Sequence, residues 1–122
     1  MATETEEEKK QDAREARALL EAFWPILFCY RVPRPLKVGV LEDMLSDAKA
    51  RGLPFDRVML KKALAKYTLR YRYQDVLAQG GDRYGLDGNV CGVVTDEQQA
   101  YAKAQVIRRN AKAALVRNSK KS

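Results

Sequence analysis

The sequence predicts an α+β fold that is predominantly helical, with about five helices and one small β-hairpin. Apolar residues recur at three- and four-residue spacing through most of the chain, which is typical of amphipathic helices. Only residues 83–94 differ, because an Asp87-Gly88 pair lies there between two short segments and predicts a hairpin turn. The length of 122 residues allows one domain and excludes a second independent core.

The first two helices are separated by a proline-rich loop. One is predicted from Lys9 to Trp24, because Pro25 disfavours helical backbone at Trp24. The second is predicted over Leu36–Arg51, ahead of Gly52-Leu53-Pro54. Their expected inward residues are Ala13, Ala16, Leu20, Phe23 and Trp24 in the first helix, and Val40, Leu41, Met44, Leu45 and Ala48 in the second.

The middle of the chain predicts a third helix from Arg57 to about Lys66. Asp56 can cap this helix through its carboxylate. Residues 68–78 either continue the same helix or, with Thr68 as a break, form a new one, and Gly80-Gly81 ends the helical half. The expected apolar stripe of the third helix is Leu60, Ala63, Leu64 and Tyr67.

A final helix follows the hairpin. Thr95 and Gln98 have the spacing of a capping box. The expected inward residues of this helix are Ala100, Tyr101, Ala104 and Ile107. The predicted organisation is an acidic disordered tip (1–8), a folded domain (9–111) and a loosely anchored basic tail (112–122). The tail either contacts a polyanion or is only a basic helix end.

The charge distribution predicts a polyanionic partner. Lys and Arg number 23 against 16 Asp and Glu, a net charge of +7. Four Glu lie within residues 3–8, so the rest of the chain carries +11. Such a basic domain is typical of proteins that bind nucleic acid or an anionic membrane surface.

The residue types exclude most catalytic chemistry. The chain has no histidine and two cysteines, Cys29 and Cys91, without metal-ligand spacing. We therefore expect no enzyme, no metal and no cofactor. The sequence contains no run of about 18 apolar residues and no secretory signal, so a cytoplasmic protein without a membrane partner is expected, with reduced cysteines.

Basic residues and tyrosines alternate most densely between Arg57 and Arg83. Cations neutralise phosphates and flat side chains stack on unpaired bases, so this mixture favours RNA or single-stranded DNA. The alternative is a solvated helix face with core tyrosines. Helical spacing places Tyr73 near Leu69 and Val76, as expected for a core tyrosine.

Several motifs, in order, resemble the ProQ/FinO domain family. The string Arg34-Pro35-Leu36-Lys37-Val38-Gly39-Val40 is similar to that family's RPLKIGI signature. Leu60, Ala63-Leu64, Tyr67-Thr68 and Arg72-Tyr73 match its second pattern, and Arg83 with Leu86-Asp87-Gly88 and Cys91-Gly92 resembles its hairpin. The resemblance covers about residues 18–111.

The resemblance implies a bacterial RNA-binding protein, described as an RNA chaperone. Its expected targets are structured RNAs, chiefly the lower stem and the 3′ single-stranded, U-rich tail of intrinsic-terminator hairpins. Its expected partners are small regulatory RNAs and mRNA 3′ ends, which it would stabilise and help to pair, and a monomer is expected. The alternative is a general basic DNA-binding or architectural protein.

The resemblance also implies a set of RNA-binding residues. Lys37 matches the signature lysine, and Lys61 replaces a family arginine, keeping the charge without the bidentate fork. Ala65 stands where some members carry another arginine, so this chain either binds more weakly or depends on Arg70 and Lys66. Arg34 either contacts RNA or holds its loop together. The full expected set is Arg34, Lys37, Arg57, Lys61, Thr68, Arg70, Arg72, Tyr73 and Arg83.

Overall fold

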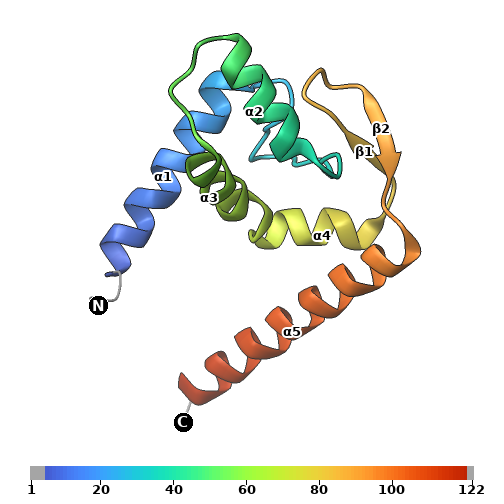
Figure 1. Cartoon of the computed structure of the whole chain (residues 1–122). Helices are drawn as coiled ribbons and strands as arrows, with labels where there is room; N and C mark the ends of the chain where they lie inside the picture. Colours follow the sequence, from blue (N-terminus) through green and yellow to red (C-terminus); the bar gives the residue numbers. More distant parts are fainter. Residues whose placement is uncertain (1–4, 121–122) are drawn as a thin grey trace.

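The computed structural model describes residues 5–120 and has the predicted fold class. Within these residues, five helices and one antiparallel hairpin follow one another as α1 (Glu6–Phe23), α2 (Val40–Ala50), α3 (Arg57–Thr68), α4 (Tyr71–Gln79), β1 (Asp82–Tyr84), β2 (Val90–Val93) and α5 (Asp96–Lys120). Figure 1 shows α1, α2 and α3 forming one side of the molecule, while α4 leads to the hairpin and to α5.

The core lies between α1, α2, α3 and the start of α4. Leu20, Leu27, Met44 and Leu60 are fully buried in it. Tyr67 on α3 is at its aromatic centre. Its ring makes edge-on contacts with Phe28 and Tyr30, at centroid distances of 5.0 and 4.8 Å, and its hydroxyl donates to the carbonyl of Cys29 at 3.1 Å. Helix α3 is thereby fixed against the segment that follows α1.

Helix α1 begins at Glu6, earlier than the predicted Lys9. The cause is a capping box: the Thr5 hydroxyl accepts from the backbone N–H of Glu8, and the Glu8 carboxylate accepts from that of Thr5. Residues 6–8 of the predicted disordered tip therefore form the first turn of α1, and residues 1–4 lie outside the described residues.

Helix α2 begins at Val40, not at the predicted Leu36. Gly39 precedes it with φ of 87°, a left-handed conformation that separates the helix from the residues before it. Leu36 instead forms a parallel bridge with Tyr84 of β1. The signature segment thus lies beside β1 and is joined to it by an isolated bridge.

A break separates α3 from α4, which decides between the two alternatives left open by the sequence. Arg70 is extended, with φ of −68° and ψ of 144°. Side-chain donors replace the backbone N–H groups that a continuous helix would supply here. Gln74 donates to the carbonyl of Thr68 at 2.8 Å, and Arg109 donates to that of Leu69. The carbonyls at the end of α3 are therefore satisfied without a continuous helix.

The hairpin and the capping box of α5 are confirmed. Gly88 has φ of 82° in the turn between β1 and β2. The Thr95 hydroxyl accepts from the backbone N–H of Gln98, whose side chain accepts from that of Thr95. Both cysteines are free and exposed.

The predicted inward face of α5 is wrong. Tyr101 and Ile107 are each 67% exposed, Ala100 and Ala104 are also exposed, and Ala102 is buried instead. Gln98 accepts from Arg83 at 2.9 Å and Gln99 donates to the carbonyl of Ala78 at 3.0 Å. These polar contacts determine which face of α5 turns inward. A prediction from the spacing of apolar residues does not include them.

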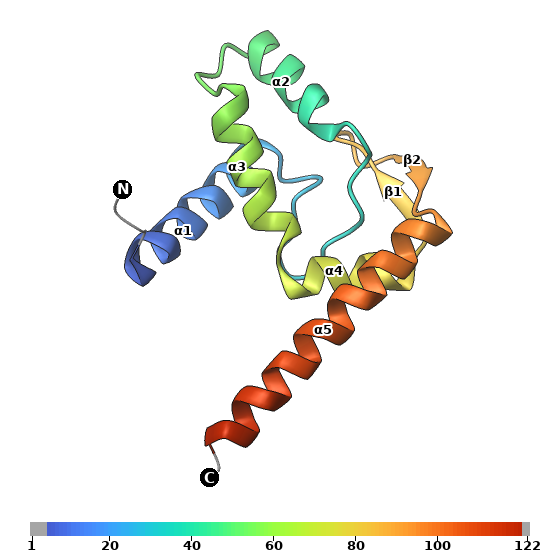
Figure 2. The same cartoon turned by 60° about the horizontal axis from the view of Figure 1, so that its bottom comes forward.

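Helix α5 continues through residues 112–120 of the predicted tail, and residues 121–122 lie outside the described part of the chain. Figure 2 shows its C-terminal half projecting beyond the other helices. None of the helices between residues 5 and 120 has the length and apolar character needed to cross a membrane.

Candidate nucleic-acid interface

The signature segment is joined to the hairpin through its backbone. The N–H of Lys37 donates to the carbonyl of Tyr84, and the N–H of Tyr84 donates to the carbonyl of Pro35, both at 2.9 Å. Two prolines leave the segment with few donors of its own, so this pairing determines its path. Lys37 is consequently held at the edge of β1.

Two predicted contact residues lie behind Lys37. The Tyr73 hydroxyl accepts from the N–H of Leu36 at 3.0 Å, and the Arg83 guanidinium donates to the carbonyl of Leu36 at 2.6 Å. Tyr73 is 4% exposed and Arg83 8% exposed. Burial raises the pKa of Tyr73, so its hydroxyl stays protonated. Both side chains hold the peptide groups next to Lys37 in place.

The ammonium of Lys37 is paired with a carboxylate. It lies 2.6 Å from Asp43 at the start of α2, and this hydrogen bond raises the pKa of Lys37. The two residues line a hollow of about 310 Å³ together with Asp87, Asn89 and Cys91 of the hairpin side. A phosphate approaching Lys37 therefore meets one cation with two carboxylates nearby.

Arg34 and Arg57 make structural contacts. Arg34 donates to the carbonyl of Ile26 at 2.7 Å and lies 4.4 Å from the ring centre of Tyr84, which agrees with its alternative role of holding the loop. Arg57 forms a two-pronged ion pair with Glu42, with N–O distances of 2.6 and 3.0 Å, and this pairing lowers the pKa of Glu42.

Lys61 and Thr68 lie on α3. The Lys61 side chain is exposed, as is Ala65 one turn later. Thr68 is half-buried, and its carbonyl accepts from Gln74. Lys61 is therefore available to a ligand, whereas Thr68 belongs to the α3–α4 junction.

Arg70 and Arg72 belong to a second cluster, at the start of α4. They donate to the carbonyls of Tyr30 and Arg31, each at 2.9 Å. Arg17 of α1 joins them around Tyr30. Sequence patterns did not identify Arg17, Tyr30 and Arg31 as site residues. They belong to other segments, and no spacing pattern links residues 17, 30 and 70.

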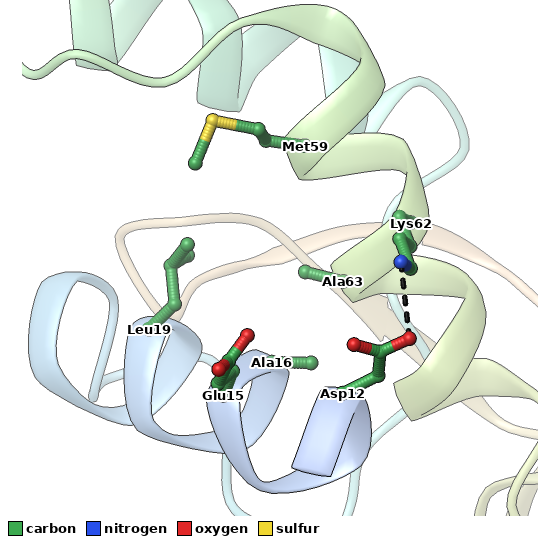
Figure 3. A pocket seen from close by; sticks show the side chains of 7 residues that line it. All are labelled: Asp12, Glu15, Ala16, Leu19, Met59, Lys62 and Ala63. Carbon is green, nitrogen blue, oxygen red and sulfur yellow. Dashed lines mark ion pairs between the residues drawn. The ribbon is translucent and has the colours of Figure 1, made fainter. Parts of the chain in front are cut away.

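Another hollow lies between α1 and α3 and has a different character. Figure 3 shows Asp12 and Glu15 on α1 facing the α3 side, with Asp12 paired to Lys62 at 3.1 Å. Leu19 and Met59 form its apolar part. Its balance of one ammonium and two carboxylates is the same as in the hollow beside Lys37.

Solved structures with this fold define the class of protein. A FinO-like RNA chaperone from Neisseria meningitidis MC58 has a TM-score of 0.61 at 28% identity, over 78% of this chain and 74% of that one. A ProQ homolog from Legionella pneumophila has a TM-score of 0.64 at 25% identity, over 89% and 87%. The class is that of FinO-like and ProQ-homologous domains.

The chain belongs to the ProQ/FINO family, whose sequence model matches residues 6–119. It is 32% identical to the RNA chaperone ProQ of Vibrio vulnificus over 86% of this chain and 51% of that protein. It is 34% identical to a fertility inhibition protein of Escherichia coli O157:H7, over 75% and 50%. The chain therefore spans about half the length of the curated relatives it matches.

Proposed function

We propose that the protein binds structured RNA and acts as a non-enzymatic RNA chaperone. Its target is the lower stem and 3′ single-stranded, U-rich tail of intrinsic-terminator hairpins. It stabilises small regulatory RNAs and mRNA 3′ ends and promotes RNA–RNA pairing, as a cytoplasmic monomer. An A-form stem offers phosphates and 2′-hydroxyls to a basic surface, and an unpaired end offers an accessible base.

The observation that carries the proposal is the fixed position of Lys37. Residues matching three separate family motifs meet there: Leu36-Lys37 of the first, Tyr73 of the second and Arg83 of the third. Such convergence gives a reason for the motifs to occur together, because each holds the backbone that presents the Lys37 ammonium. A positioned cation selects a phosphate at one place instead of attracting RNA generally.

The first experiment measures binding of the full chain to one terminator hairpin at fixed salt. The same hairpin without its U tail, and the same stem in DNA, are the comparison ligands. We expect a large loss of affinity without the tail and weak binding to DNA. Equal affinity for all three ligands would contradict the proposal and favour a general basic DNA-binding protein.

A second experiment tests the residues. Lys37→Ala and Lys61→Ala should each weaken binding to the complete hairpin, because both remove a cation from the proposed surface. Lys49→Ala is the matched control, since Lys49 is exposed on the last turn of α2. Substitutions of Tyr73 or Arg83 are less direct, because both side chains are buried and support the fold.

A further inference from the structure

A second hollow is surrounded by arginines. Arg17 of α1, Tyr30 and Arg31 after α1, and Arg70 and Arg72 at the start of α4 line about 440 Å³. The guanidinium carbons of Arg17 and Arg70 lie 5.0 and 4.5 Å from the ring centre of Tyr30. Three separate segments thus bring four guanidinium groups around one phenol.

Two hydrogen-bonding atoms at this hollow have no partner within residues 5–120. The Tyr30 hydroxyl and Nη1 of Arg70 are both buried, and Tyr30 as a whole is only 8% exposed. A buried donor without an acceptor costs free energy, so native proteins nearly always satisfy such groups. Both residues line the hollow, so an acceptor bound there is the group that would satisfy these two atoms.

The charges around the hollow specify an anion. Arg17 is paired with Glu21. Arg70 and Arg72 each donate one hydrogen bond to a backbone carbonyl, which fixes the direction of their guanidinium groups. Arg31 is exposed. Helix α4 starts here without a side-chain cap among the described residues, which adds the positive end of its dipole. Arginine forks of this kind match the oxygens of phosphate.

We propose that Arg17, Tyr30, Arg31, Arg70 and Arg72 form a phosphate-binding subsite in which Tyr30 and Arg70 donate to one phosphate. Arg72 of this subsite is followed on α4 by Tyr73, which holds the peptide N–H of Leu36 next to Lys37, so one RNA contacts the protein at both places. The RNA part of this inference rests on the proposed function. The phosphate itself is either an internal phosphodiester or a terminal or free phosphate group.

The sharpest variant is Tyr30→Phe, which removes only the unpartnered hydroxyl. The ring still contacts Tyr67 and the two guanidinium groups, so thermal stability should stay equal or rise. Affinity for the terminator hairpin should nevertheless fall about three- to tenfold, the size of one lost hydrogen bond. If Tyr30 has only a structural role, Tyr30→Phe should bind the hairpin with the affinity of the wild type.

A charge-matched pair of double variants tests the arginines. Arg17→Gln/Arg31→Gln removes two cations from the hollow, and Arg14→Gln/Arg108→Gln removes two exposed cations elsewhere. The first should weaken RNA binding about tenfold and reduce the slope of log K against log salt by about one, as expected for one lost phosphate contact. The second should leave the slope unchanged.

Small probes identify the source of the phosphate. Inorganic phosphate, uridine 5′-monophosphate and uridine are titrated into the isotope-labelled full chain while backbone and arginine side-chain NMR signals are followed. Shifts at residues 30, 31, 70 and 72 with the two phosphates, absent with uridine, support the subsite with a terminal or free phosphate. Effects on RNA binding alone support an internal phosphodiester.

Two results together overturn the subsite. Neither phosphate probe shifts the signals of these residues, and RNA binding is unchanged in Tyr30→Phe relative to the wild type and in Arg17→Gln/Arg31→Gln relative to Arg14→Gln/Arg108→Gln. Wild-type RNA binding in that experiment would leave the proposed function intact. If the wild-type chain binds no RNA while the phosphates still shift these signals, the proposed function fails and the subsite stands.

Discussion

The hydroxyl of Tyr73 accepts a hydrogen bond from the backbone N–H of Leu36 at a distance of 3.0 Å. This contact crosses 37 residues of sequence and joins α4 to the segment that carries Lys37. A tyrosine expected at the RNA surface is therefore buried one layer beneath it. Under the proposed function, Tyr73 affects RNA binding through the position of Lys37.

Tyr73→Phe should lower both stability and RNA affinity. The substitution leaves the buried N–H of Leu36 without an acceptor, which costs about 1–3 kcal/mol of unfolding free energy. Chemical denaturation followed by circular dichroism measures the first effect, and hairpin binding the second. Tyr71→Phe is the control, because Tyr71 is exposed on the same helix. Reduced affinity at unchanged stability would show that the phenol contacts RNA directly.

Asp43→Asn should tighten RNA binding at low salt. It removes a carboxylate that lies 2.6 Å from the Lys37 ammonium, so the local potential becomes more positive. The gain should shrink as salt rises, because exposed charges are screened. Glu15→Gln on α1 makes the same charge change far along the sequence and should have a smaller effect. Weaker binding by Asp43→Asn would mean that the ion pair orients Lys37 for RNA.

Two glycine substitutions should differ in cost. Gly39→Ala places a side chain at φ of 87° with open space around it, which costs about 1–2 kcal/mol of stability. Gly88→Ala has a similar φ of 82°, but its new Cβ would lie 2.8 Å from Cγ2 of Ile26. Denaturation should therefore show a larger loss for Gly88→Ala. In an Ile26→Ala background the excess should disappear, and persistence of the excess would contradict the steric explanation.

Alkaline pH should destabilise the fold through its buried phenols. Burial raises the pKa of Tyr30 to about 12, and also raises that of Tyr67. In the unfolded chain a phenol titrates near about 10. The stabilisation is complete below that pH and is lost as pH rises, because the unfolded state releases its protons first.

Unfolding free energies at about pH 9 and about pH 11, on either side of the ordinary phenol pKa, measure this loss. Tyr30→Phe should reduce the loss, and Tyr101→Phe, at an exposed position, should not. Equal losses in both variants and the wild type would assign the alkaline effect to other groups.

The sequence predicted most of what local chemistry determines. Asp56 as a cap, the Asp87-Gly88 turn and the Thr95–Gln98 capping box all lie within a few residues of the structure they create. The start of α2 was wrong because Leu36 pairs with Tyr84, which is distant in sequence. Long-range pairing overrides a local helix preference and leaves no periodic signal.

The candidate interface divides in the same way. Lys37 and Arg83 could be named from motifs. Their relation through the peptide groups of Leu36 could not be predicted, because it joins segments that are distant in the sequence. The arginine hollow could not be predicted, because Arg17 and Tyr30 come from segments whose patterns concern packing alone. The prediction of the inward face of α5 was wrong because Gln98 and Gln99, which are polar, make the contacts that orient the helix.

Trp24 is the single tryptophan of the chain. The residue is 4% exposed, and its indole N–H donates to Asp47 at 2.8 Å, which ties the end of α1 to α2. Neither the hollow beside Lys37 nor the arginine hollow includes it among its lining residues. Its fluorescence therefore reports the integrity of the helical core without a label. The fluorescence of Trp24, measured in every variant described above, shows whether that variant is folded.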